Sequence, residues 1–166
     1  MNKIYVPTGL WRDIDEKNAC ESFLEAFEEN LKGKDIDVLK GKCINLKEIA
    51  EECRSLNADI YYSVHTNISK LYKSSFSSLE IFSLVPAAKT FKIASRIRKG
   101  REMTVDFPVF LSQNKRNREI VSHKTPAIVD YLFFGDNEEN KLMFKENTAE
   151  ISAAAANAFI KVLSYY

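Results

Sequence analysis

The residue best placed for chemistry is a histidine at the end of an apolar run. Residues 58–65, ADIYYSVH, have the composition of a buried strand, and His65 ends it, two residues before Asn67. Histidine is the commonest metal ligand among side chains. His65 is one of two histidines in the chain. A histidine at a strand end can also be a hydrogen-bonded structural residue, so the sequence leaves both interpretations open.

Three segments follow predicted strands and are therefore placed to bind a ligand. They are residues 9–13, 65–67 and 130–137. Ligands of open α/β sheets bind beyond the carboxyl ends of the strands. The sequence therefore predicts a functional site at this edge of the sheet, with His65 and Asn67 in one of its segments.

Alternating strand and helix patterns position these segments. Apolar residues three and four apart, as in Cys20, Phe23, Leu24, Phe27 and Leu31, are typical of a helix with one buried face. The patterns predict helices over residues 16–32, 45–57, 86–99 and 138–164, the last with a break near 147, and strands over 3–8, 36–39, 58–65, 79–85 and 126–134. Such alternation indicates parallel strands joined by crossover helices. We expect one three-layer α/β domain over residues 1–166, with a mostly parallel central sheet flanked by helices.

The charge balance argues against some classes of partner. The chain has 24 basic and 23 acidic residues, so no global field indicates nucleic acid. No apolar run is long enough for a signal peptide or a membrane span. We expect cytoplasmic synthesis, and an extracellular or cell-wall location only if another route releases the chain. Residues 92–118 are locally basic, which indicates a solvated helix and loop or, alternatively, a surface for an anionic polymer.

Four stretches resemble the zinc-dependent N-acetylmuramoyl-L-alanine amidases of type 3, the amidase-3-like family of autolysins, sporulation hydrolases and phage endolysins. They are KIYVPTGL (3–10), DEKNAC (15–20), NLKEIAEECRSLNADIYYSVHTN (45–67) and PAIVDYLFFGDN (126–137). The third is the most specific, because its end is similar to the family's Ser-Ile-His-Ala-Asn. LEIF (79–82) also resembles a family strand and places Glu80 at its glutamate. The resemblance covers nearly the whole chain and includes no separate wall-binding module.

The resemblance implies a zinc hydrolase site. In the family, two histidines and one glutamate hold zinc and leave one position open for water. A second glutamate acts as general base and acid in cleaving the amide between the muramic acid lactyl group and L-alanine. His65 matches the second zinc histidine, and Glu16 matches the zinc glutamate. Leu10 stands where the first histidine is expected, and Tyr131 stands where the catalytic glutamate is expected.

Two chemical functions are therefore replaced. Leucine has no lone pair to offer a metal, and tyrosine, whose ordinary pKa is about 10, is a poor base at neutral pH. Asp130 is a possible substitute base, but it points to the opposite face of the strand from Tyr131. His123 is a possible replacement ligand, or an ordinary surface residue. Asn67, Glu80 and His123 are expected to line the cleft.

These replacements predict an amidase-fold protein that is non-catalytic or impaired and binds a peptidoglycan fragment or a protein partner. One alternative is a divergent, active zinc amidase, a cell-wall hydrolase or endolysin that uses substitute residues. Another is a structural or interaction subunit with a vestigial cleft. No cofactor is expected, although a weak zinc site of His65 and Glu16 stays possible, and nucleic acid is not expected as a partner.

Overall fold

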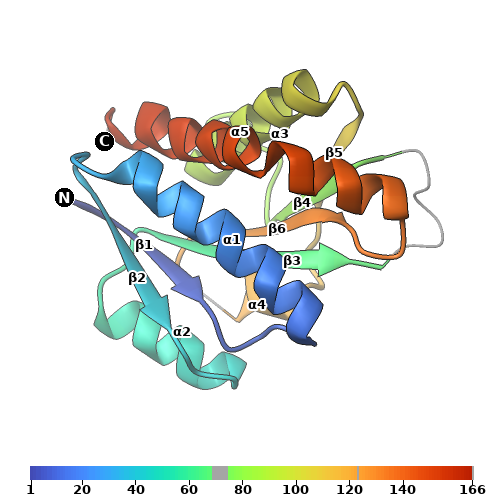
Figure 1. The fold of residues 1–166 in the computed structure, drawn as a ribbon. Helices are drawn as coiled ribbons and strands as arrows, with labels where there is room; N and C mark the ends of the chain where they lie inside the picture. Colours follow the sequence, from blue (N-terminus) through green and yellow to red (C-terminus); the bar gives the residue numbers. More distant parts are fainter. Residues whose placement is uncertain (69–74, 123, 166) are drawn as a thin grey trace.

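The computed structural model describes residues 1–68, 75–122 and 124–165 of the chain. Its strands form one central sheet with helices on both faces (Figure 1). The elements in chain order are β1 (Asn2–Pro7), α1 (Ile14–Leu31), β2 (Ile36–Gly41), α2 (Leu46–Ser55), β3 (Ile60–Asn67), β4 (Ser77–Ile81), α3 (Lys89–Val105), β5 (Val109–Gln113), α4 (Arg118–Val121), β6 (Ala127–Phe134) and α5 (Glu138–Leu163). The predicted α/β fold with three layers is confirmed.

The sheet has the strand order β2-β1-β3-β6-β4-β5. Strands β1, β2, β3 and β6 run parallel, and β4 pairs antiparallel with β6 but parallel with β5. The mostly parallel sheet is thus as predicted. Crossover helices keep β1, β2 and β3 parallel, so the carboxyl ends of β1, β3 and β6 meet at one edge.

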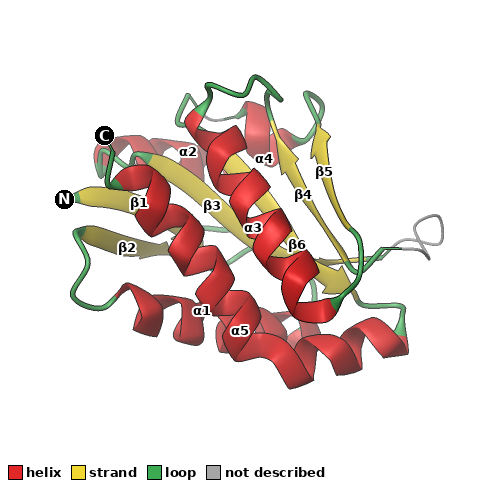
Figure 2. Cartoon of the chain, turned by 90° about the horizontal axis from the view of Figure 1, so that it is seen from above, coloured by secondary structure: helices red, strands yellow, loops and turns green. Residues whose placement is uncertain are grey.

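Helices α1, α3 and α5 cover one face of the sheet, and α2 and α4 lie on the other (Figures 1 and 2). Because side chains alternate along a strand, neighbouring residues of β3 pack on opposite faces of the sheet. Tyr62 packs with Phe27 and Phe159 under the first set of helices. Tyr61 stacks on Tyr5 under the second, with ring centroids 6.2 Å apart. Both faces of the central strands are therefore buried.

The segment between α3 and β6 holds more regular structure than the sequence indicates. Helix α3 continues to Val105, beyond the predicted end at 99, and β5 and α4 lie between residues 99 and 126, where no helix or strand was predicted. Strand β5 is at the edge of the sheet and leaves Phe110 half exposed, so its apolar pattern is weak. The predicted break in the last helix is confirmed, because Asn147 has the non-helical angles φ −120° and ψ 18°.

One member of the locally basic stretch is not on the surface. Arg101 of α3 is fully buried and forms two hydrogen bonds with Asp130 of β6, at 2.7 and 2.8 Å. It also donates to Ser77 of β4 at 3.1 Å. Arg101 thus ties α3 to the sheet, and the basic surface consists of its neighbours alone. Within the described residues, we find no helix with the length and apolarity needed to cross a membrane.

Candidate functional site

The candidate site residues lie at the carboxyl edge of the parallel strands. The loop after β1 is fastened there by Trp11, whose indole Nε1 donates to the carbonyl of Val64 on β3 at 3.0 Å. Gly9 lets this loop pass close to the segment before α2, because a Cβ on Gly9 would lie 2.5 Å from the carbonyl oxygen of Cys43. His65 of β3 lies beside Tyr131 of β6 in the sheet register, with ring centroids 6.1 Å apart.

Glu16 stands in the first turn of α1, which Asp13 caps by accepting a hydrogen bond from the Glu16 amide at 2.8 Å. Its carboxylate is buried and accepts from the backbone N–H of Arg12 at 2.7 Å and of Thr66 at 2.8 Å. Burial alone would raise the pKa of Glu16, but His65, Arg12 and these amides outweigh it and lower the pKa to about 2. Glu16 is therefore ionised at neutral pH.

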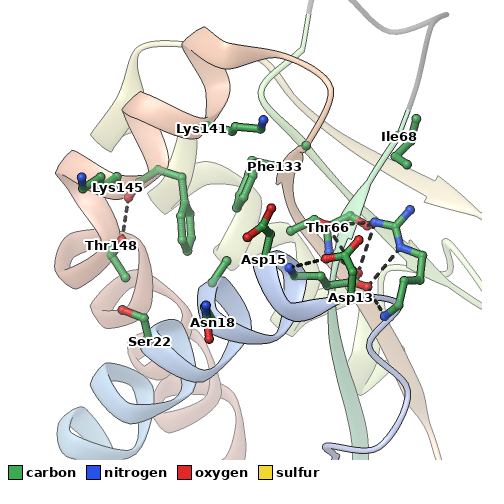
Figure 3. A pocket seen from close by; sticks show the side chains of 15 residues that line it. Asp13, Asp15, Asn18, Ser22, Thr66, Ile68, Phe133, Lys141, Lys145 and Thr148 are labelled. Carbon is green, nitrogen blue, oxygen red and sulfur yellow. Dashed lines mark hydrogen bonds and ion pairs between the residues drawn. The ribbon is translucent and has the colours of Figure 1, made fainter.

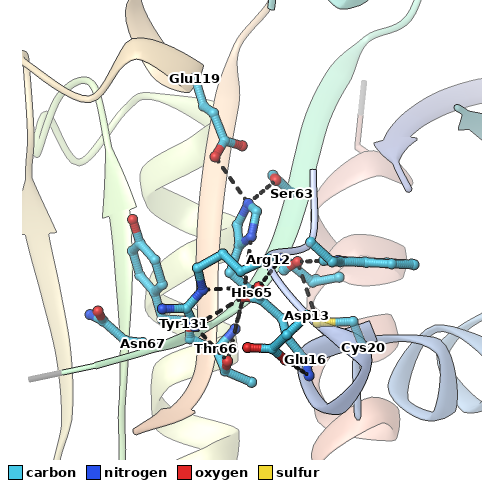
Figure 4. A network of polar contacts seen from close by, with 12 residues as sticks. Arg12, Asp13, Glu16, Cys20, Ser63, His65, Thr66, Asn67, Glu119 and Tyr131 are labelled. Carbon is cyan, nitrogen blue, oxygen red and sulfur yellow. Dashed lines mark hydrogen bonds and ion pairs between the residues drawn. The ribbon is translucent and has the colours of Figure 1, made fainter. Parts of the chain in front are cut away.

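The cation on this carboxylate comes from the protein itself. The Arg12 guanidinium donates from Nε to Glu16 Oε2 at 3.0 Å (Figure 4). Its Nη2 donates to the carbonyl and the hydroxyl of Thr66, at 2.7 and 2.9 Å. Arg12 thus joins the loop after β1 to the end of β3. The sequence placed Arg12 in a ligand-binding segment, but no spacing signal marked it as the partner of Glu16.

His65 is held between two carboxylates. Its Nε2 is 3.0 Å from Glu119 Oε1 and 2.8 Å from the Ser63 hydroxyl, and its Nδ1 is 3.5 Å from Glu16 Oε1 (Figure 4). Burial disfavours the imidazolium, but hydrogen bonds and charge from Glu119 and Glu16 outweigh it and raise the pKa of His65 to about 9. His65 is thus a cation at neutral pH, and a metal that binds it would have to displace a proton.

Glu119 is a site residue that the sequence did not reveal. It lies in the short helix α4, and the Tyr61 hydroxyl donates to its second oxygen at 2.9 Å. Burial would raise the pKa of Glu119, but His65 outweighs burial and lowers it. Its position 54 residues after His65 follows no motif, so only the folded chain brings them together.

Tyr131 belongs to a neighbouring polar group. The side-chain amide of Asn117 donates to Glu80 at 2.7 Å and lies 3.5 Å from the Tyr131 hydroxyl. Burial, together with the negative charges of Glu80 and Glu119, raises the pKa of Tyr131 well above its usual range. Tyr131 is therefore neutral at physiological pH and a poor acceptor for a water proton. Glu80 is thus placed at the edge of the same site.

The remaining predicted site residues lie as follows. Asp130 is directed to the other face of the sheet, as its position on the strand required, and both its oxygens are bonded to Arg101. Leu10 packs against the apolar cluster under α2, to which Tyr131 also contributes. The side chain of Asn67 accepts from the amide of Ile68 at 2.8 Å. His123 lies outside the described residues.

These side chains do not fit a zinc ion. Across residues 1–68, 75–122 and 124–165, no group of three His, Cys, Asp or Glu side chains is placed to hold a metal. Catalytic zinc sites use three protein ligands with free lone pairs. Here Glu16 is neutralised by Arg12, and both ring nitrogens of His65 face carboxylates. The arrangement is a set of two cations and two anions that balance each other.

Comparison with known proteins gives the fold. No protein-family model and no curated protein sequence matches the chain. Solved structures do match over its whole length. The catalytic domain of CwlV, an N-acetylmuramoyl-L-alanine amidase of Bacillus (Paenibacillus) polymyxa var. colistinus, has a TM-score of 0.80 at 15% identity, with 100% of both chains covered.

Two further structures show the same similarity. The CwlD amidase of Clostridioides difficile, solved in complex with the GerS lipoprotein, has a TM-score of 0.75 at 16% identity, again with 100% of both chains covered. The catalytic domain of CD27L, an endolysin that targets Clostridia difficile, has a TM-score of 0.76 at 18% identity, covering 99% of this chain and 98% of its own. The chain therefore has the fold of N-acetylmuramoyl-L-alanine amidase catalytic domains.

Proposed function

We propose that this chain is a non-catalytic protein of the amidase fold that binds peptidoglycan fragments at the carboxyl edge of its sheet. The fold similarity over the whole chain supports the ligand class, because the similar structures are amidases of peptidoglycan. The loss of catalysis is supported by the site residues.

One observation carries the proposal. Glu16 and His65, the two residues that match zinc ligands, are each neutralised by groups of the same chain. A metal would have to displace the Arg12 guanidinium and remove a proton from His65, whose pKa is about 9. Tyr131 adds no base to activate a water molecule. Hydrolysis therefore lacks both of the groups that the amidase mechanism requires.

The test combines a metal assay with two wall assays. Protein purified without chelator is analysed for zinc, incubated with dye-labelled cell walls, and sedimented with unlabelled walls. We expect substoichiometric zinc, no dye release above buffer, and cosedimentation with the walls. Stoichiometric zinc together with dye release would show an active amidase and contradict the proposal. If the protein does not sediment with the walls, the proposed binding of peptidoglycan is contradicted, and the proposed loss of catalysis is not.

A second candidate is a protein-interaction subunit. The outer surface of α3 carries the exposed basic residues Arg96 and Lys99. The CwlD amidase, which shares the fold, was solved with a protein partner. Charge reversal at Arg96 and Lys99 separates the two candidates: if it abolishes partner capture while wall binding is unchanged, the interaction role is supported.

A further inference from the structure

A cavity lies next to the charged network, between the start of α1 and the first half of α5. Its volume is about 620 Å³, and Arg12 and Glu16 are among the residues that line it. Ligand sites in proteins commonly have volumes of about 300–1,000 Å³. The cavity is thus large enough for a short peptide.

The floor of the cavity is apolar. Phe133 of β6 and Phe144 of α5 form it, with ring centroids 4.7 Å apart, and Ala19 of α1 adjoins them. The two side chains keep 6% and 4% of their surface exposed, so they offer a ligand a small apolar contact. Such a floor favours the aliphatic part of a ligand, because burying apolar surface is favourable without regard to direction.

The walls of the cavity carry opposite charges. Asp15 extends into it from α1, and Lys141 and Lys145 stand on α5 (Figure 3). Among the described residues, Asp15 and Lys145 have no hydrogen-bond or ion-pair partner, whereas Lys141 is bonded to Glu138 at 2.6 Å. Lys141 also interacts electrostatically with Asp15. An acidic wall and a basic wall complement a ligand that carries both an ammonium and a carboxylate.

We infer that this cavity binds a short zwitterionic peptide, with the ligand ammonium on Asp15, its carboxylate on Lys145 and its aliphatic chain over Phe133 and Phe144. The inference builds on the proposed function, because the peptide part of a peptidoglycan fragment has this chemistry and the sugar part does not. It assigns the peptide to the α1–α5 cavity and leaves the sugars to the edge of the sheet.

The experiment is an NMR titration of the whole chain with two peptides. One is N-acetyl-L-alanyl-γ-D-glutamyl-L-lysine, and the other replaces lysine by norleucine, which removes only the side-chain ammonium. We expect the lysine peptide to bind about two- to fivefold more tightly, as for a solvent-accessible ion pair. The shifted resonances should lie on α1 and α5.

Variants at Asp15 and Lys145 test which charged group of the peptide each side chain binds. Asp15→Asn should remove the preference for the lysine peptide, and Lys145→Gln should weaken both peptides equally. Glu25→Gln on α1 and Lys161→Gln on α5 are matched controls on exposed positions, and they should change neither affinity. Retained preference in Asp15→Asn, equal binding of the two peptides, or no binding at all would overturn the inference.

The cosedimentation assay tests wall binding separately from peptide binding in the cavity. Peptide binding without cosedimentation would support the cavity and contradict the wall-binding role. Cosedimentation without peptide binding would overturn the cavity and leave the wall-binding role in place. Shifts confined to residues outside α1 and α5 would count against the cavity as well.

Discussion

The charge state of His65 decides what the site can do. In a zinc site the imidazole must be neutral, so that a ring nitrogen can offer its lone pair. In this chain Glu119 and Glu16 stabilise the imidazolium instead, and Arg12 supplies a second cation. His65 and Glu16 are therefore engaged in ion pairs that join the loop after β1, the end of β3 and helix α4.

The first prediction concerns the stability of the protein as a function of pH. The pKa of His65 is raised in the folded state from 6.5 to about 9, so its contribution is fully present below about pH 6.5 and is lost as pH rises through 9. The loss is on the order of 3 kcal/mol. Urea unfolding of the wild type and of His65→Gln at pH 6 and 9.5 measures it.

Other groups titrate over the same range, so the difference between the two proteins is the quantity to compare. The wild type should be the more stable of the two at pH 6, and this advantage should shrink at pH 9.5. An advantage that is constant or grows with pH would show that His65 is neutral in the folded protein.

The second prediction concerns the cation on Glu16. Arg12→Met removes the guanidinium and leaves a buried carboxylate with fewer donors, so the free energy of unfolding should fall by about 1–3 kcal/mol. Lys17→Met is the matched control, because Lys17 pairs with Glu21 at the same i,i+4 spacing on the exposed side of α1. That change should cost less than about 0.5 kcal/mol. Equal costs would mean that the Arg12 pair is an ordinary surface contact.

At the scale of elements, α3 and α5 approach each other closely at one point. Gly100 of α3 lies against Ala154 of α5, and a Cβ on Gly100 would be 2.8 Å from the Ala154 Cβ. The two helices form part of the layer over β3 and β6, from which Arg101 reaches Asp130. The position of α3 over the sheet thus depends on a small residue at its contact with α5.

The third prediction follows from this contact. In an exposed helix, glycine to alanine stabilises by about 1 kcal/mol. Here Gly100→Ala should instead destabilise by about 1–3 kcal/mol, because the new methyl group overlaps Ala154 and the helices must separate. The double variant Gly100→Ala/Ala154→Gly should recover most of the loss. Thermal unfolding checks both, and a stabilised single variant would contradict the contact.

For the whole molecule, the internal balance of charge at the site bears on whether metal ions affect the stability of the folded protein. Metal ions that bind only the folded state contribute to its stability, and their removal lowers it. In this chain the charges at the carboxyl edge are neutralised by Arg12 and His65, so the folded state needs no ion there.

The fourth prediction is that stability does not respond to metal. The thermal midpoint with EDTA and the midpoint with excess zinc should agree within about 1 °C. A rise of several degrees with zinc that disappears in His65→Gln would show that the site binds metal in the folded protein. The readout is independent of wall hydrolysis.

Much of this protein could be read from local patterns along the chain. Apolar runs and helical spacing placed the central strands and long helices, and the alternation of side chains along β6 already put Asp130 and Tyr131 on opposite faces. The strand end at His65 and the helix start at Glu16 followed from the same patterns and from the resemblance. These features depend on near neighbours in the chain, which is why sequence alone determined them.

The partners of these residues were decided only by tertiary structure. Glu119 reaches His65 across 54 positions, and Arg12 reaches Thr66 across the same number. Arg101 looked like a surface charge among basic neighbours, yet it is buried on Asp130. No local periodicity encodes such distant pairs. The sequence therefore determined which strand and helix ends meet at this edge of the sheet, and the packing of loops and helices determined that Arg12 and His65 lie against its carboxylates.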